Sequence, residues 1–223
     1  MDILLADPRF AAHTFVVMDF EGLTPTGRPP EPIEVAALAL KVRGGVLERV
    51  GRFESLIRPP ADLPFTSFDV GTSGITERDL RRAEPASAVM ARLDALLRFP
   101  PYRLVAQSAT VEGNFIARQR AHCPTLAAIP LLDTVRMARR AVPGLTGYSL
   151  DLLLGHYGIA VPAQRHRAGA DTEVTAQVWA RLLADGAARG CWGSLFELEM
   201  AAAVQPRSAH SAQAARGEQD ELF

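Results

Sequence analysis

The chain has 223 residues, of which 48% are hydrophobic and 22% are charged, and its formal net charge is −1. This composition is ordinary for a soluble globular protein, and the length allows one good-sized α/β domain or two small ones. The near-zero net charge excludes a global basic field for nucleic acid. An enzyme acting on nucleic acid would therefore need a local basic patch, or metal ions in its site.

Neither a membrane-spanning segment nor a signal peptide is predicted. No apolar run approaches membrane-spanning length, and the N-terminus has no basic region before its short apolar run. Cys123 and Cys191 lie far apart and match no metal or redox spacing. We therefore expect a cytoplasmic protein that does not bind membranes and whose cysteines are reduced.

The N-terminal part of the chain predicts three strands. A continuous apolar run from Phe15 to Met18 is typical of a strand buried on both faces. After a loop rich in Gly and Pro, two further strands are expected at 33–42 and 47–57, joined by a turn at 43–45. Close sequential strands with short turns predict an antiparallel meander.

The rest of the chain alternates between helices and short strands. Strands are expected at 103–107 and 129–132. Helices are expected after Thr76, around Val89 to Leu97, and at 111–120, 134–142, 149–158, 168–184 and 191–204. The fold class is therefore α/β, with a mixed five-stranded sheet that is antiparallel on one side, parallel on the other, and flanked by helices.

The composition changes at Gln205 to Pro, Ser, Gln, Ala and Arg. A segment of this kind cannot bury much apolar surface. We expect one folded domain over 1–204 and a disordered tail over 205–223.

The end of the first strand carries two acids. Asp19 and Glu21 are two residues apart, so a strand directs both side chains to the same side. Carboxylates at the end of a buried strand need a cation or hydrogen bonds to offset the cost of burial. Oxygen ligands suit Mg²⁺ or Mn²⁺. Taken alone, the pair fits the end of a strand with two solvated acids better than a metal site.

Two later stretches add further acids. Glu112 lies near the start of a predicted helix, where the helix dipole by itself favours a carboxylate. His166 precedes the helix expected at 168–184, and Asp171 lies in its first turns. Taken in isolation, that last pair reads as a capping acid beside a surface histidine.

Together the three stretches resemble the DEDD family of 3′–5′ exonucleases in its histidine variant, to which the proofreading subunit of bacterial DNA polymerase III, ribonuclease T and exonuclease X belong. Asp19 and Glu21 match its D-x-E motif, and His166 with Asp171 matches its third motif. The second motif departs from the usual H-N-A-x-F-D. Here Gln-Ser replaces His-Asn at 107–108, and Glu112 replaces the aspartate.

The resemblance implies a ribonuclease-H-like fold and hydrolysis with two Mg²⁺ or Mn²⁺ ions. Asp19 would bridge both ions, Glu21, Glu112 and Asp171 would complete their shells, and His166 would act as general base. The product would be nucleoside monophosphates released from the 3′ end of a single-stranded or frayed strand.

Four residues near these motifs are candidates for nucleic-acid contact. Phe20 and Leu23 flank the first motif and would stack against terminal bases, with core packing as the alternative. Arg165 and Arg167 bracket His166 and would contact phosphates.

DNA is the expected substrate, in repair or proofreading, with RNA as the alternative within the same chemistry. The alternative from another class is a catalytically impaired adaptor that binds nucleic acid or the replication clamp, because motif two carries Glu112. The last five residues, 219–223, contain Gln219, Leu222 and Phe223 in the order Q-x-x-L-F. They resemble the short peptide by which bacterial replication and repair proteins bind the sliding clamp.

Overall fold

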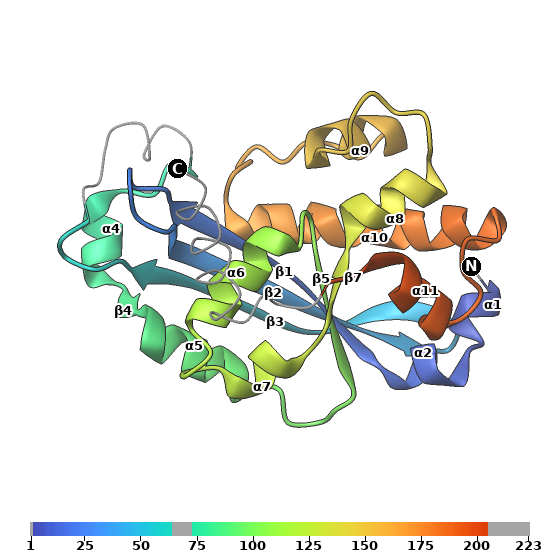
Figure 1. Cartoon of the computed structure of the whole chain (residues 1–223), viewed down its shortest axis with the longest axis horizontal. Coiled ribbons are helices and arrows are strands. Elements are labelled where there is room, and N and C mark those ends of the chain that lie inside the picture. The colour runs from blue at the N-terminus through green and yellow to red at the C-terminus, as the bar shows by residue number, and fades with distance from the viewer. Residues whose placement is uncertain (1, 64–72, 205–223) are drawn as a thin grey trace, which may run out of the picture.

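The computed structural model describes residues 2–63 and 73–204 of the chain. These residues form a seven-stranded sheet in the order β4-β3-β2-β1-β5-β6-β7, with helices on both faces (Figure 1). The predicted tail and its clamp-binding peptide at 219–223 lie outside the described residues. No helix in the described ranges combines the length and apolar character needed to cross a membrane.

The strands have the following bounds: β1 Thr14–Leu23, β2 Glu31–Arg43, β3 Val46–Arg58, β4 Glu84–Pro85, β5 Tyr102–Ala106, β6 Leu131–Asp133 and β7 Ala203–Val204. The helices have the following bounds: α1 Asp2–Leu5, α2 Pro8–Ala12, α4 Glu77–Arg82, α5 Ala86–Asp94, α6 Thr110–Arg118, α7 Pro124–Ala128, α8 Thr134–Ala141, α9 Leu150–Tyr157, α10 Ala168–Ala188 and α11 Leu195–Ala202.

The pairing confirms the predicted mixed sheet. β1, β2 and β3 pair antiparallel in sequence order, and β1, β5 and β6 pair parallel. The five predicted strands are all present. Two strands of two residues extend the sheet at its edges, where β4 pairs parallel with β3 and β7 pairs antiparallel with β6.

The central strand β1 divides the core into two layers. Phe15 and Val17 pack in one cluster with helices α8 to α11, where Trp179 of α10 is fully buried. Val16 and Met18 point the opposite way, into a second cluster that contains residues of α5, α6 and α7. This alternation follows from the two-residue period of a strand, and it determines which side chains of β1 can meet α10.

Local signals set most helix ends where the sequence places them. Thr76 and Asp79 form a capping box at α4, and Ser149 caps α9, which ends at Gly158 in a left-handed conformation (φ 61°). The last helix begins later than the expected residue 191. Ser194 accepts a hydrogen bond from the backbone N–H of Glu197, so α11 begins only at Leu195.

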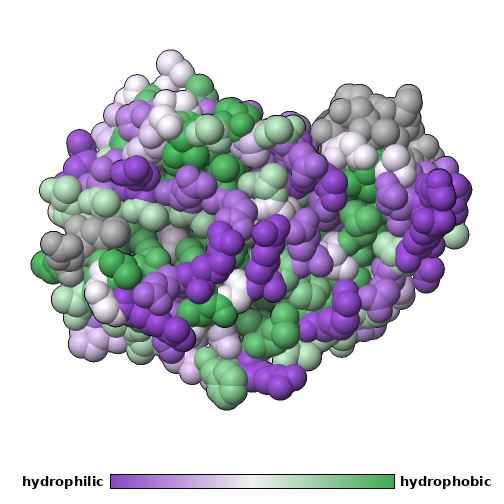
Figure 2. All heavy atoms as spheres, turned by 180° about the vertical axis from the view of Figure 1, so that it is seen from behind, coloured by the Kyte–Doolittle hydropathy of each residue, from purple (hydrophilic) through white to green (hydrophobic). Residues whose placement is uncertain are grey.

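Figure 2 shows the face turned away in Figure 1, coloured by the hydropathy of each residue. Hydrophilic and hydrophobic residues are interspersed across that face (Figure 2). This fits a domain of ordinary composition and near-zero net charge.

Candidate active site

The end of β1 presents two carboxylates to the start of α10. Asp19 and Glu21 share the side of β1 that Phe15 and Val17 occupy, and that side packs on α10. Both side chains are partly buried. The alternation of β1 thus directs the two acids of the first motif to one place, as the sequence predicts.

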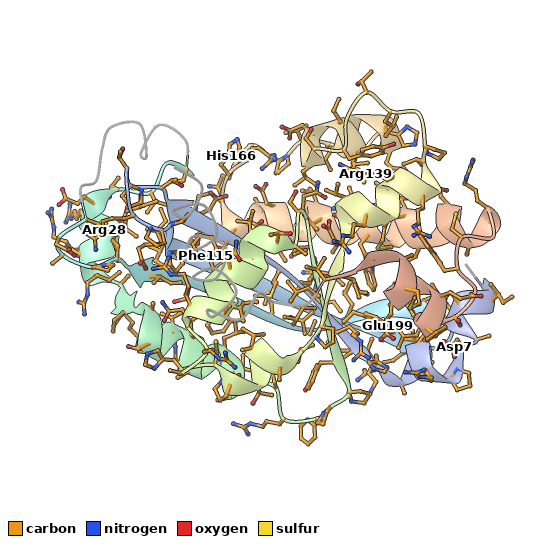
Figure 3. All side chains as sticks on the ribbon, viewed as in Figure 1. Asp7, Arg28, Phe115, Arg139, His166 and Glu199 are labelled. Carbon is orange, nitrogen blue, oxygen red and sulfur yellow. The ribbon has the colours of Figure 1, made fainter. Side chains whose placement is uncertain are left out.

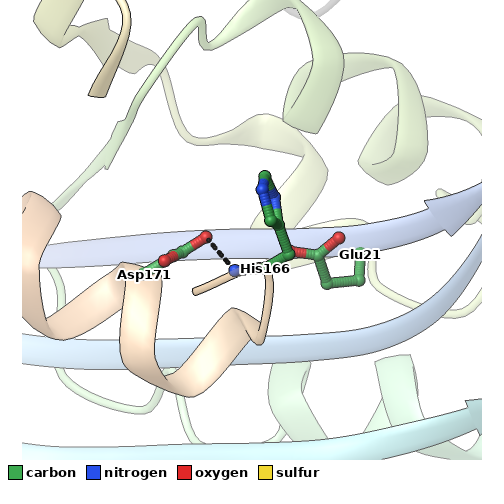
Figure 4. Close-up of side chains that lie close together, drawn as sticks. All are labelled: Glu21, His166 and Asp171. Atoms are coloured by element: carbon green, nitrogen blue, oxygen red, sulfur yellow. Dashed lines mark hydrogen bonds between the residues drawn. The ribbon is translucent and has the colours of Figure 1, made fainter. Parts of the chain in front are cut away.

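Asp171 lies in the first turn of α10 and is only 4% exposed. Its Oδ2 accepts a hydrogen bond from the backbone N–H of His166 at 3.2 Å and a second from the guanidinium of Arg165. Single ligand atoms of Glu21, His166 and Asp171 all lie within 4.8 Å of one another (Figure 4). The first and third motifs therefore meet in space.

Glu112 reaches the same end of β1 from another element. β5 runs parallel to β1, so α6, which follows β5, begins near the end of β1. The side chain of Glu112 in the first turn of α6 is 3% exposed, and it lies close enough to Asp19 to raise the pKa of that group. The second-motif glutamate thus joins the other three carboxylates.

Crowding and burial shift the ionisation of these acids. Burial, followed by repulsion from Glu112, Glu21 and Asp171, raises the pKa of Asp19 well above its usual value. Burial and the neighbouring Asp171 raise the pKa of Glu21 to about 7. Burial is also the main cause that raises the pKa of Glu112 to about 8. The pKa of Asp171 is raised by burial and held back by Arg165.

The donor set fits divalent cations with oxygen ligands. Glu112 Oε2 and Asp171 Oδ1 are buried and have no hydrogen-bond partner among the described residues. Several carboxylates whose raised pKa values disfavour the charged form gain from a cation that restores it. Asp19, Glu21, Glu112 and Asp171 are therefore suited to hold Mg²⁺ or Mn²⁺.

The two arginines that bracket His166 are both paired with acids. Arg165 Nε donates to Asp151 at 2.7 Å in addition to its bond with Asp171. Arg167 donates to the buried carboxylate of Glu34 on β2. A phosphate contact by either arginine stays a prediction, and for Arg167 it would require the guanidinium to leave Glu34.

Phe20 and Leu23 lie in the core of the protein. Phe20 is 7% exposed, and its ring centroid is 5.3 Å from that of Phe115. Leu23 is 2% exposed and packs with Ile33, Ile75 and Leu80. Core packing, the alternative considered from the sequence, accounts for both placements, and base stacking stays a prediction.

The departure at the second motif has a visible structural use. Gln107 Nε2 donates to the backbone carbonyl of Tyr148 at 2.8 Å, and its Oε1 accepts from the hydroxyl of Thr134. Gln107 thus ties the end of β5 to α8 and to the loop before α9. Asp133 caps α8 by accepting from the backbone N–H of Val135 at 2.8 Å, and it lies near Glu112.

Glu34 and its pairing with Arg167 were not expected from the sequence. A charged residue followed directly by the apolar run 35–40 is a signal that could have drawn attention to it. Its partner lies 133 residues further along the chain, a distance that no local pattern reveals.

Comparison with known proteins agrees with this geometry. A family model described as exonuclease matches residues 16–179. The chain is 35% identical over 193 residues to a DNA polymerase III subunit epsilon-like protein of Rhodobacter capsulatus, covering 83% of this chain and 26% of that protein. It is 30% identical over 182 residues to the PolC-type DNA polymerase III of Thermotoga maritima, covering 79% of this chain and 12% of that protein. The chain thus spans about a quarter or less of these relatives' length.

Solved structures share the fold. The nuclease domain of 3′hExo, described as a DEDDh family member bound to rAMP, superposes with a TM-score of 0.65 at 20% identity, over 81% of this chain and 96% of that domain. Exonuclease X in complex with 5′ overhanging duplex DNA gives a TM-score of 0.57 at 21% identity, over 78% and 93% of the two chains. The exonuclease family model matches residues 16–179, which is most of this chain, and the motif residues lie together at the end of β1. This chain therefore belongs to the exonuclease family.

Proposed function

We propose that the protein is a 3′–5′ exonuclease that depends on two divalent cations and removes nucleoside monophosphates from the 3′ ends of DNA. The observation that carries the proposal is the convergence of Asp19, Glu21, Glu112 and Asp171, from three separate elements, beside His166. The names of the relatives, which are DNA polymerase III proteins, favour DNA over RNA.

The four carboxylates would hold the cations. Asp19, which interacts with each of the other three, would contribute to both cation sites. When bound, such a pair activates the attacking water and stabilises the leaving oxygen. Two observations support this assignment. One carboxylate oxygen of Glu112 and one of Asp171 are buried without a hydrogen-bond partner, and the pKa values of Glu21 and Glu112 are raised.

His166 would act as the general base. It is exposed at the edge of the cluster, and its backbone N–H is tied to Asp171 while its imidazole remains accessible. The imidazole would take the proton of the attacking water. Arg165, at the mouth of the cluster, would contact the phosphate of the strand.

The direct test compares a DNA and an RNA oligonucleotide, each labelled in two ways. Single-stranded DNA and RNA, each labelled at the 3′ end or at the 5′ end, are incubated with Mg²⁺, Mn²⁺, Ca²⁺ or excess chelator, and the products are sized. We expect the 3′ label to be released at once as a mononucleotide, and the strand that carries the 5′ label to shorten stepwise. Activity should require Mg²⁺ or Mn²⁺ and fail with Ca²⁺, which is larger and less strict in geometry.

Three outcomes would count against the proposal. Nucleotide release that continues in excess chelator would remove the metal requirement. Faster loss of RNA than of DNA would make RNA the substrate. Binding without any hydrolysis would favour the adaptor alternative. An Asp19→Asn variant is the control for contaminating nucleases, because it changes one ligand while leaving the length of the side chain intact.

A further inference from the structure

Glu34 is a buried acid next to the candidate active site. It lies on β2, directly opposite Glu21 of β1 in the antiparallel register, and is only 1% exposed. Opposed residues of an antiparallel pair share one face of the sheet, so Glu34 faces the start of α10 as Glu21 does. A carboxylate buried to this extent requires several donors to offset its desolvation.

The donors of Glu34 come from the segment that follows His166. Arg167 Nε lies 3.1 Å from each carboxylate oxygen, and Arg167 Nη2 lies 2.6 Å from Oε1. The backbone N–H of Ala168 donates to Oε2 at 2.9 Å. Ala168 is the first residue of α10, and the N-cap residue Arg167 makes no side-chain cap hydrogen bond. Glu34 therefore caps α10 from a strand 134 residues away in sequence.

His166 stands between two fixed flanks. Its φ of 66° lies in the left-handed region, which residues other than glycine seldom adopt unless their surroundings hold them there. On one side, Arg165 is bonded to Asp151 and Asp171. On the other side, Arg167 and Ala168 are bonded to Glu34. Holding both neighbours fixes the backbone that carries the imidazole.

The side chain of Glu54 on β3 lies beside the start of α10. A Cβ added at Gly169 would come within 2.6 Å of Glu54 Oε1, the end of this exposed and flexible side chain. The contact between Glu34 and the helix start is itself buried, because Glu34 is only 1% exposed.

We propose that Glu34 is a positioning residue for His166, acting through Arg167 and the first backbone N–H of α10. The inference rests on the proposed role of His166 as general base. In this proposal Glu34 acts through these hydrogen bonds and not through contact with substrate or cations. Its expected effect is on the placement of the imidazole, and misplacement of a catalytic group by about 1 Å can cost on the order of 10²-fold in rate.

The test begins with Glu34→Gln, which keeps the shape and removes the charge. We expect kcat to fall by roughly 10- to 100-fold, with KM within about twofold. Hydrogen exchange of the backbone amides across 165–168 should rise by at least about tenfold, because the capped N–H loses its charged acceptor. Glu199→Gln is the matched control. Glu199 pairs with Arg103 at 2.6 Å, also linking a helix to a strand, in a part of the molecule well away from His166 (Figure 3).

The decisive measurement repeats Glu34→Gln in a His166→Ala background. If Glu34 acts only through the imidazole, the second substitution will lower the residual rate no further. A loss of the same size in both backgrounds would overturn the inference, since it would show a general structural role. A full-rate Glu34→Gln enzyme would overturn it as well.

Two further variants keep the test valid if Glu34→Gln does not fold. Arg167→Lys keeps the charge and loses the two-pronged bond, and we expect the same His166-dependent fall in kcat. Glu34→Asp retains the charge and should recover part of the rate. A full-rate His166→Ala enzyme would overturn the general-base assignment itself and with it this inference, and the single variant makes that failure recognisable.

Discussion

The guanidinium of Arg165 donates to Asp171, the carboxylate that also accepts from the backbone N–H of His166. A cationic side chain thus forms an ion pair with one of the four acids that are proposed to bind cations. Asp19 also interacts electrostatically with this guanidinium. In the protein without bound cations, Arg165 is therefore a counter-charge to the carboxylates of the cluster.

Replacing Arg165 with Ala should change cation and DNA binding in opposite directions. Loss of a positive charge beside the carboxylates should tighten Mn²⁺ binding by about tenfold, equivalent to ~1.4 kcal/mol. The KM for DNA should rise, because the proposed phosphate contact is lost. Calorimetric titration and steady-state kinetics measure the two effects, with Arg92→Ala, which removes an exposed pair with Glu84, as control. Weaker Mn²⁺ binding by Arg165→Ala would contradict this account.

Replacing His166 with Ala should lower kcat by roughly 10²–10⁴-fold, the usual contribution of general-base catalysis. Cation affinity and KM should change little, because Asp171 keeps its bond from the backbone N–H of residue 166, which the substitution retains. Single-turnover rates and calorimetry check both statements. An unchanged turnover would remove His166 from the mechanism.

Glu112 offers a test of the unusual second motif. Glu112→Gln places a neutral amide where the cluster needs a charged ligand, and we expect a strong loss of both activity and cation binding. Glu112→Asp should also weaken cation binding, roughly 10- to 100-fold, because its reach is one methylene shorter in a pocket closed around glutamate. Activity and cation affinity are measured for both variants.

A rise in activity of Glu112→Asp would show that the pocket has not adapted to the longer side chain. Neutral results for both variants would mean that the ligand lies elsewhere. Asp133 is the nearest candidate, since it is buried and lies close to Glu112.

The free energy of unfolding of the cation-free protein should fall as the pH rises. The folded-state pKa values of Glu21, about 7, and Glu112, about 8, lie above the ordinary value of 4.5. Above pH 4.5, and up to these folded-state pKa values, the folded state therefore binds more protons than the unfolded chain. The free energy of unfolding falls over this pH range, and the stabilisation is lost once the pH has passed about 7 for Glu21 and about 8 for Glu112.

Thermal melting across this range, in chelator and in saturating Mg²⁺, measures the effect. Mg²⁺ binds the charged carboxylates, so it should reduce the decline in melting temperature. The Glu112→Gln variant should show a smaller slope in chelator. A melting temperature that increases with pH in chelator would contradict the raised pKa values.

The peptide at 219–223 lies outside the described part of the chain, so its binding to the sliding clamp stays a prediction. Gln219, Leu222 and Phe223 should give binding to the host's sliding clamp in the micromolar range, roughly −8 kcal/mol. A short peptide motif would raise the local concentration of the enzyme at DNA ends. Titration of the intact protein into the clamp, against a variant with Leu222→Ala and Phe223→Ala, measures this. Equal binding by both forms, or none by the intact protein, would refute it.

Much of the fold is predictable because its signals are local. The meander follows from apolar runs separated by Gly-rich turns, and Ser149 and Gly158 mark both ends of α9. α7, at Pro124–Ala128, was missed because five residues are too few for a helical period to show. The short helices α1 and α2 were missed for the same reason.

The candidate site divides in the same way. The spacing of Asp19 and Glu21 on a strand predicts that they share a side, because this depends on backbone geometry alone. The tie from Gln107 to Tyr148 and the pair of Glu34 with Arg167 join residues 41 and 133 positions apart. Such pairings arise only when the sheet and helices pack, so the sequence carries no local trace of them.

The cap that Glu34 places on α10 also bears on how the protein acquires activity during folding. The contact between residues 34 and 168 joins positions 134 residues apart, and contacts so far apart in sequence are typical of slow folding. The meander and the nearby helices can form from neighbouring segments, whereas the loop bearing His166 acquires its conformation only when β2 and α10 meet. We therefore expect nuclease activity to recover after dilution from denaturant only once β2 and α10 have packed together.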